Sequence, residues 1–147
     1  MAEYPPYLPV HRVVGWTKRR KHPYRAERYM QISFVGLEEL QERMADGSFG
    51  RQVVRVLLAM MASCDYDNRV QAGQKDLARK LGMAQSHIST AINTLIAHGF
   101  VERGENYHAR YVISPRFCWK GGEDTLRQAL SERNLLDKDG YLRGRAA

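Results

Sequence analysis

Two short segments near the N-terminus of this 147-residue chain combine β-branched and aromatic residues in the manner of strands. They are residues 11–17 and 28–35, and a basic stretch at residues 18–27 separates them. Polar and apolar positions interleave in the second segment, which indicates one buried and one solvated face. We therefore expect a strand pair here, preceded by an extended arm at residues 1–9, where three prolines disfavour a helix.

Three later segments have the apolar spacing of helices. Residues 37–45 form the first of them, after a break at Gly36, and their apolar side chains fall on one face. Residues 50–64 are apolar around nearly the whole circumference, which is typical of a buried helix. Residues 123–133 predict a helix near the C-terminus, again with apolar side chains along one side.

Residues 74–98 combine two short helices with a glycine between them. Leu77 and Leu81 supply the inner face of the first helix, and Gly82 permits the tight turn. Apolar residues recur at helical spacing through residues 88–96 of the second helix. This is the pattern of a helix-turn-helix, which places its second helix in the major groove of DNA. An ordinary helical hairpin is the alternative.

Polar side chains occupy the face of the second helix opposite its apolar residues. Short polar side chains of this kind can hydrogen-bond base edges and phosphates. No Lys or Arg lies within residues 84–98, so the helix lacks the commonest specific contact, arginine to guanine. Ala84 also stands where a small hydroxyl residue would usually cap such a helix. The predicted base-reading residues are Gln85, Ser86, His87, Ser89, Thr90 and Asn93.

A β-hairpin is predicted directly after the second helix. Residues 100–103 and 109–113 have strand character, and five residues join them. A hairpin in this position forms a wing beside the helix-turn-helix. The side chains that would project from it toward the DNA backbone or minor groove are Arg103, His108 and Arg110. Simple solvent exposure is the alternative for the two arginines.

The chain carries 23 basic and 16 acidic side chains, a net charge of +7. Residues 1–35 hold seven basic and two acidic side chains, and residues 74–121 hold seven and three. Such a surplus favours a polyanionic partner. Because the second helix has no cation, other segments must neutralise the phosphates. The candidates are Lys75, Arg79 and Lys80 on the first helix, and Lys18, Arg19, Arg20 and Lys21 in the N-terminal stretch.

Composition and missing motifs exclude several classes of protein. Cys64 and Cys118 are the only cysteines, which excludes a disulfide scaffold and suits a reducing cytoplasm. No apolar run approaches the roughly 20 residues of a membrane span, and the N-terminus lacks the features of a signal peptide. The histidines form no metal-ligand spacing, and phosphate-binding or serine-nucleophile motifs are missing. We therefore expect a cytoplasmic protein, not an enzyme, with no metal and no cofactor.

These elements together predict an α+β fold, mostly helical with a small β content. Residues 1–35 would form an N-terminal arm and a basic β-hairpin. Residues 36–121 would form a winged helix-turn-helix domain, and residues 122–147 a C-terminal helix and tail.

Several stretches between Leu58 and Gly122 follow a family pattern. They read DYDNRV, LGM, LIAHGFVERG and, at residues 111–121, YVISPRFCWKG. In these stretches the chain resembles the winged-helix replication and maintenance proteins of plasmids and phages, the RepL-like group, which in turn resemble MarR-type regulators. Ser114 stands where that group has Asn. The resemblance implies a winged-helix fold that binds a plasmid or phage DNA site.

The resemblance and the charge favour a sequence-specific double-stranded DNA-binding protein that starts or maintains plasmid or phage replication, recruiting host replication proteins. A winged-helix transcriptional repressor, a centromere-binding partition adaptor and a protein-interaction module without DNA remain as alternatives, because fold-level analogy cannot separate them. Winged-helix proteins commonly dimerise on paired half-sites. We therefore expect a homodimer, with the C-terminal helix packing on its own domain or pairing with a second subunit.

Replacing Lys18, Arg19, Arg20 and Lys21 together with Ala should weaken binding to every DNA sequence and flatten its salt dependence. Each lost phosphate contact removes about 0.9 from the slope of log K against log salt, so the loss of four contacts should lower the slope by about 3.6. Fluorescence anisotropy on duplex DNA over a range of salt concentrations measures it. An unchanged slope would contradict the assignment of this cluster to phosphate binding.

Overall fold

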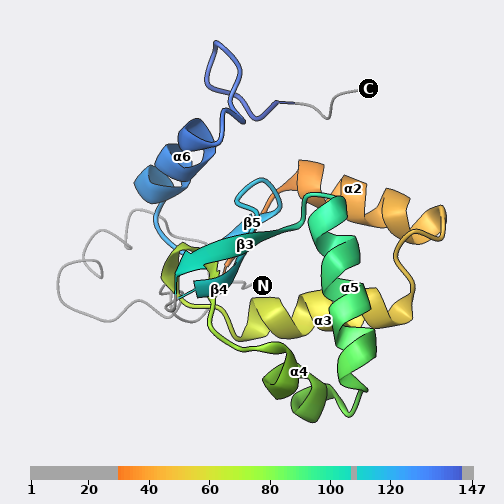
Figure 1. The fold of residues 1–147 in the computed structure, drawn as a ribbon. Coiled ribbons are helices and arrows are strands. Elements are labelled where there is room, and N and C mark those ends of the chain that lie inside the picture. The colour runs from red at the N-terminus through yellow and green to blue at the C-terminus, as the bar shows by residue number, and fades with distance from the viewer. Residues whose placement is uncertain (1–29, 107–108, 144–147) are drawn as a thin grey trace, which may run out of the picture.

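The computed structural model describes residues 30–106 and 109–143 of the chain. Helices gather around one face of a small antiparallel sheet, and a terminal helix lies beside the sheet (Figure 1). The elements in chain order are β1 (Gln31–Ile32), α2 (Phe34–Ala45), α3 (Arg51–Ala62), a 3-10 turn η1 (Tyr66–Asn68), β2 (Arg69–Val70), α4 (Gln74–Leu81), α5 (Gln85–Ala97), β3 (Val101–Asn106), β4 (Ala109–Ile113), β5 (Cys118–Trp119) and α6 (Glu123–Glu132). The predicted α+β winged helix-turn-helix is confirmed.

The wing is the strand pair β3 and β4 of the sheet β2-β4-β3, in which β4 is the central strand. All pairings are antiparallel, and Tyr111 of β4 faces Val70 on one side and Arg103 on the other. Strand β3 runs further than predicted, because the ladder resumes at Asn106 and Ala109 after an irregularity, whereas β4 has its predicted bounds. The expectation of a five-residue connection is therefore wrong.

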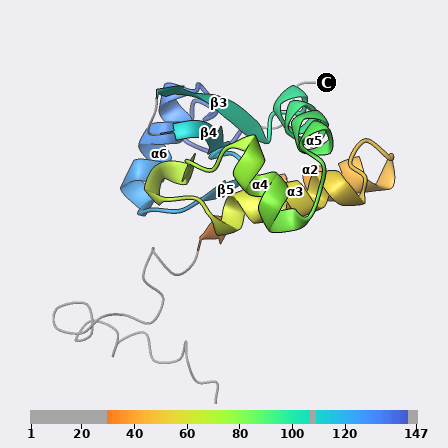
Figure 2. The same ribbon diagram turned by 60° about the horizontal axis from the view of Figure 1, so that its bottom comes forward.

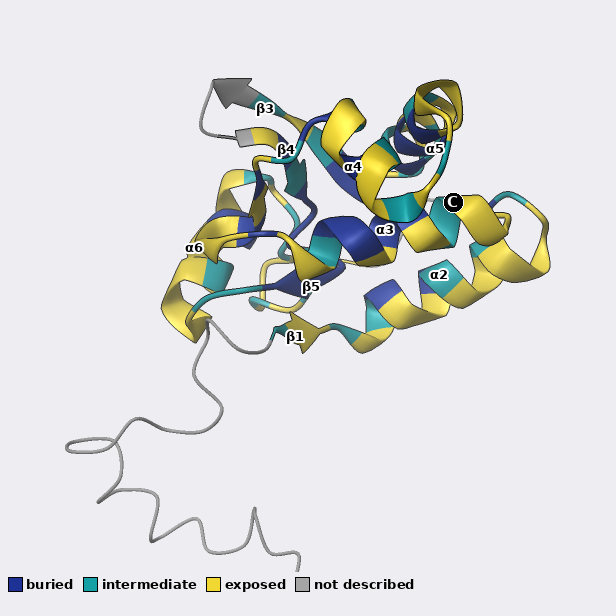
Figure 3. Cartoon of the chain, turned by 90° about the horizontal axis from the view of Figure 1, so that it is seen from below, coloured by how far each residue is buried: buried dark blue, intermediate teal, exposed yellow. Residues whose placement is uncertain are grey.

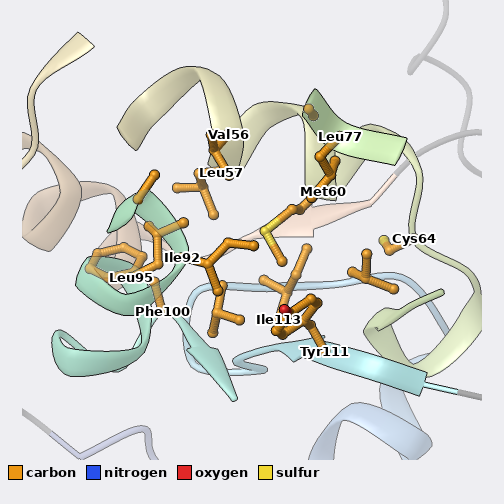
Figure 4. Packing of buried hydrophobic residues seen from close by; sticks show 14 of the residues in the cluster. Val56, Leu57, Met60, Cys64, Leu77, Ile92, Leu95, Phe100, Tyr111 and Ile113 are labelled. Carbon is orange, nitrogen blue, oxygen red and sulfur yellow. The ribbon is translucent and has the colours of Figure 1, made fainter. Parts of the chain in front are cut away.

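One core holds the helices against the sheet. Its side chains interdigitate from α3, α4, α5 and the strands (Figure 4). Each fully buried aliphatic side chain in such a core contributes roughly 1.5–3 kcal/mol. The most deeply buried members include Val56, Leu57, Met60, Leu77, Ile88, Ile92, Leu95, Val101 and Ile113.

Helix α3 is buried along one side rather than all round. Val56, Leu57 and Met60 are fully buried, whereas Leu58 is 54% exposed. Arg55 shares the exposed side. The expectation of a helix enclosed on every side is wrong, because α4 and α5 pack against only one face of α3.

The segment before the first helix also differs from its prediction. The arm at residues 1–9, the strand at 11–17 and the start of the strand at 28–35 lie outside the described part of the chain, so the predicted strand pair stays a prediction. Within the described residues the second strand is limited to β1, which pairs with β5 through Gln31↔Trp119 and Ile32↔Cys118, and its end belongs to α2. Ser33 then starts α2, because its hydroxyl oxygen accepts a hydrogen bond from the backbone N–H of Gly36 at 2.8 Å.

Gly36 lies inside α2, so the predicted break at this position is wrong. A Cβ built on Gly36 would lie 2.8 Å from the Cα of Phe117 and 2.7 Å from its ring. Any larger residue would push the helix away from that segment. Gly36 therefore serves close packing of α2 and not the end of a strand.

Asn68 joins three segments at the base of the sheet. Its side-chain amide donates to the carbonyl oxygens of Ile113 and Cys118 at 2.8 and 2.7 Å, and its side-chain oxygen accepts from the backbone N–H of Lys120 at 2.8 Å. The residue is fully buried and left-handed, with φ 61°. Asn tolerates this conformation better than most residues. Asn68 therefore satisfies buried backbone groups that no strand reaches.

Helix α6 packs on its own domain. Ala129 and Leu130 are buried, and Arg133 donates from Nε and Nη2 to the two carboxylate oxygens of Glu102 on β3 at 2.8 and 3.0 Å. The helix lies beside the wing, away from α5 (Figure 2). The first alternative predicted for its apolar side, packing within the chain, is thus confirmed.

Asn68→Ala should lower the free energy of unfolding by about 3–5 kcal/mol, because two buried carbonyl oxygens and one N–H lose their partner. Asn134→Ala is the matched control, since Asn134 is also left-handed, with φ 56°, but exposed. It should cost only about 1 kcal/mol. Urea denaturation followed by circular dichroism measures both. An equal loss of unfolding free energy in the two variants would show that Asn68 contributes only through its left-handed backbone conformation.

Candidate nucleic-acid interface

The helix-turn-helix is built by α4, a left-handed glycine and α5. Gly82 ends α4 with φ 64°, and the next N–H, that of Met83, donates to the carbonyl oxygen of Ala78 at 3.1 Å. Leu77 from α4 and Ile88 from α5 are buried in the common core. The predicted helices and their inner faces are confirmed, which leaves the outer face of α5 free for contact.

Two side chains fix the ends of α4. The N–H of Gly73 donates to the carboxylate of Asp76 at 3.1 Å, which neutralises an end where helical N–H groups lack partners. At the other end, Nη2 of Arg55 donates to the carbonyl oxygen of Leu81 at 3.0 Å. Sequence reasoning missed Arg55 because it treated α3 as wholly buried. A lone arginine within an apolar helix was the available signal.

Helix α5 begins without a side-chain cap. Ala84 occupies the capping position, and only its backbone carbonyl accepts hydrogen bonds, from the N–H groups of His87 and Ile88 at 3.0 and 3.2 Å. The departure noticed in the sequence is therefore real, since no side-chain cap of this helix occurs among the described residues. In that part of the chain the positive end of the α5 dipole is left without a capping side chain.

The polar face of α5 is open to solvent. Ser86, Thr90 and Asn93 are exposed and follow one another at intervals of four and three residues, so they form one stripe. The Thr90 hydroxyl donates to the carbonyl oxygen of Ser86 at 3.0 Å, so its oxygen remains to accept. Gln85 and His87 are exposed beside the start of this stripe, whereas Ser89 is half-buried.

A wing arginine reaches the end of this stripe. Nη2 of Arg103 on β3 donates to the side-chain oxygen of Asn93 at 3.4 Å, and both side chains are exposed. The recognition helix has no cation of its own, yet this contact places a guanidinium beside it. The sequence predicted that Arg103 would point toward the DNA backbone or minor groove. Its position against α5 instead makes it part of the same surface as Asn93.

Arg110 lies close to the start of α4. A Cβ built on Gly73 would lie 2.9 Å from Nη1 of Arg110, so the guanidinium covers that glycine. Arg110 is exposed, as is Lys75 two residues after Gly73. The structure thus places a wing arginine against the start of the helix that carries Lys75.

The remaining predicted cations are less closely grouped. Arg79 forms an exposed ion pair with Asp76 at 3.5 Å, which offsets part of its charge, and Lys80 is exposed at the end of α4. His108 lies outside the described residues, and so do Lys18, Arg19, Arg20 and Lys21.

We searched the part of the chain that the structure describes for metal sites and for reactive thiols. No group of three or more potential metal ligands occurs there. Burial raises the pKa of the Cys118 thiol to about 12, with a smaller contribution from Cys64, and burial also raises the pKa of Cys64. Both thiols are therefore protonated at neutral pH and poorly nucleophilic. Among the described residues, no helix has the length and apolarity needed to cross a bilayer.

A family model, that of the MarR family, matches residues 67–106 of the chain. This span begins just before β2 and ends with β3, so it contains both helices of the helix-turn-helix. The match supports the broader likeness to MarR-type winged-helix proteins but not the narrower one to RepL-like replication proteins. No curated protein matches the chain. No solved structure matches it either.

Ala84→Ser should raise the free energy of unfolding by about 1 kcal/mol, because the new hydroxyl can accept from a free N–H in the first turn of α5. Ala97→Ser, at the other end of the same helix, is the control. It should be neutral or slightly destabilising, since no N–H is free there. Thermal and urea denaturation compare the three proteins. A loss of stability in Ala84→Ser would contradict the uncapped helix start.

Proposed function

We propose that the protein is a sequence-specific regulator of transcription that binds double-stranded DNA through α5 and its wing, and acts as a repressor. The observation that carries this proposal is the position of the MarR match. It coincides with a helix-turn-helix whose second helix is exposed on its polar face. The proposal follows the repressor alternative of the sequence interpretation, since the match gives no support to a replication role.

The exposed stripe of α5 suits the reading of base edges. The Asn93 amide carries both donors and an acceptor, as the pairing of an amide with adenine requires. Nη2 of Arg103 donates to the Asn93 side-chain oxygen at 3.4 Å, which favours one orientation of the amide. The NH₂ group and the second lone pair of the oxygen remain for a base. The remaining donors of Arg103 can reach a phosphate or a base next to the one that Asn93 contacts.

Affinity in this proposal comes from cations around the reading helix. Lys75, Arg110 and Arg103 are exposed on three different elements that surround α5. Phosphate contacts of this kind set register and overall affinity but carry no sequence information. The open N-terminus of α5 adds free N–H groups to the same side, and these favour an anion. The residues that contact bases and the cations that contact phosphates are thus separate sets.

Repression needs only occupancy of a promoter, so no catalytic step enters the proposal. MarR family proteins act typically as dimers, and a two-fold symmetric protein reads half-sites about one helical turn apart. We therefore propose a homodimer on a pseudo-palindromic site, acting in the cytoplasm without a metal or cofactor.

The proposal is tested by selecting DNA sites from a random duplex library with the full chain. We expect recovery of a site with two-fold symmetry, followed by footprinting on it and by repression of a reporter whose promoter contains it. Recovery of no enriched sequence, with binding that is equal on all duplexes, would overturn sequence-specific regulation. An enriched site that fails to repress the reporter would overturn the repressor role alone.

Single substitutions should separate residues that contact bases from residues that contact phosphates. Asn93→Ala should weaken binding to the selected site by roughly 1–3 kcal/mol and leave binding to random DNA almost unaffected. Lys75→Ala should weaken binding to both kinds of DNA and lower the slope of log K against log salt by about 1. Titrations by fluorescence anisotropy on selected and random duplexes measure these effects.

Arg127→Ala is the charge-matched control, because Arg127 is exposed on α6, away from α5. It should change neither binding constant. If Asn93→Ala weakened both duplexes equally, Asn93 would be a backbone contact and the assignment of the reading face would be wrong.

A further inference from the structure

Strand β3 lies at the edge of the sheet β2-β4-β3. Among the described residues, only β4 forms a ladder with it. The ladder is regular over Val101, Glu102 and Arg103 and then shifts before Asn106. An irregularity of this kind lets a strand bend. Arg103, which contacts the recognition helix, is the last residue of the regular part, so contacts outside the ladder help to fix its position.

Two neighbouring residues of β3 are bound on opposite faces of the sheet. Successive side chains of a strand alternate between its two faces. The guanidinium of Arg103 donates to the side-chain oxygen of Asn93 on α5 at 3.4 Å. The carboxylate of Glu102 accepts two hydrogen bonds, at 2.8 and 3.0 Å, from Arg133 at the end of α6. The strand is therefore held by α5 on one face and by the end of α6 on the other.

The contact between Glu102 and Arg133 fixes orientation as well as distance. Nε and Nη2 of one guanidinium donate to the two oxygens of one carboxylate, which is the bidentate geometry of a specific ion pair. Nη1 of Arg133 also donates to the carbonyl oxygen of Ala129, one turn earlier in α6, at 3.0 Å. The same guanidinium is therefore bound to the helix backbone and to the strand.

Apolar packing between α6 and the sheet is limited. The buried residues of α6, Ala129 and Leu130, do not belong to the common core. Figure 3 shows α6 as exposed over most of its surface. A cavity of about 240 Å³ lies between α6 and the sheet, and Arg133 lines it together with Trp119. The position of α6 relative to the wing therefore depends strongly on the contact of Arg133 with Glu102.

We propose that α6 holds the wing in place through this pair, and that Arg133 is a positioning residue for the contact of Arg103 with DNA. The inference rests on the proposed function, in which Arg103 acts beside the polar stripe of α5. It gives a role to a helix that lies beyond residues 67–106, the part of the chain that the MarR family model matches. Arg133 acts from the face of the strand opposite to Arg103, so it does not need to touch DNA.

Charge and position predict opposite effects for a substitution of Glu102. Glu102→Gln removes a negative charge from a DNA-binding protein, so electrostatic attraction alone would strengthen DNA binding. Loss of positioning predicts weaker binding, because a neutral amide cannot accept two charge-assisted hydrogen bonds from Arg133 and the strand is then released on that face. The pair is partly exposed, at 29% for Arg133 and 38% for Glu102, and such pairs contribute little to stability, so the variant should stay folded.

Fluorescence anisotropy with the full chain and the selected duplex tests this role. Glu102→Gln and Arg133→Met should each weaken binding by about 3- to 10-fold, within the range of coupling between residues in contact. In an Arg103→Ala background both substitutions should have almost no further effect, because they act through Arg103. Circular dichroism should show the spectrum of the parent for every variant.

Arg127→Met is the matched control for Arg133→Met, because it removes the same charge from the same helix at an exposed position. It should leave binding unchanged. Amide hydrogen exchange of residues 102–106 in the protein without DNA gives a second readout. Exchange there should be faster in Glu102→Gln and in Arg133→Met, because the edge strand opens more often, and it should stay at the rate of the parent in Arg127→Met.

The outcomes separate this inference from the proposed function. Stronger or unchanged DNA binding by Glu102→Gln overturns the positioning role. An equal weakening in the Arg103→Ala background overturns it as well, since the pair would then act elsewhere. Unchanged amide exchange at residues 102–106 in Glu102→Gln and Arg133→Met overturns it without DNA. A parent protein that binds no duplex overturns the proposed function, and the exchange experiment still decides whether α6 holds the wing.

Discussion

The three hydrogen bonds of the buried Asn68 side chain hold the wing to the rest of the domain. Strand β2 is two residues long, so its ladder with β4 supplies few hydrogen bonds of its own. Asn68, in the left-handed conformation, turns the chain into β2 and at the same time binds the end of β4 and the β5 segment. Because β4 is the central strand, this side chain holds the wing in place together with Val101 and Ile113, which are buried in the common core beside α5. The wing in turn carries Arg103 to Asn93.

The position of the wing beside α5 separates the uncharged DNA contacts of the recognition helix from the charged contacts around it. The recognition helix presents hydroxyl and amide groups, and the cations that surround it come from α4, β3 and β4. The surrounding cations would bind phosphate on any sequence, whereas the short neutral groups of the stripe gain only where a base edge complements them. An arginine that approaches from the wing adds charge without occupying the stripe itself.

Helix α2 is held to the domain by one close approach, one ion pair and one apolar contact. Gly36 lets the helix approach Phe117, Glu39 pairs with Arg116, and Leu40 packs against the core. The larger apolar residues Phe34 and Met44 lie on the exposed side of the helix. Periodicity alone would have turned those residues inward.

The sequence by itself determined the helix-turn-helix, its inner face and its exposed stripe, because these depend on spacing within a few turns and on Gly82, which permits the left-handed turn. It also determined the presence of the wing and of the C-terminal helix. Only the tertiary structure decided which side of α2 faces inward, which strand pairs with β1, and where Arg103, Arg55 and Asn68 find their partners. Each of these contacts joins residues far apart in the chain, and periodicity carries no information about which distant segments meet.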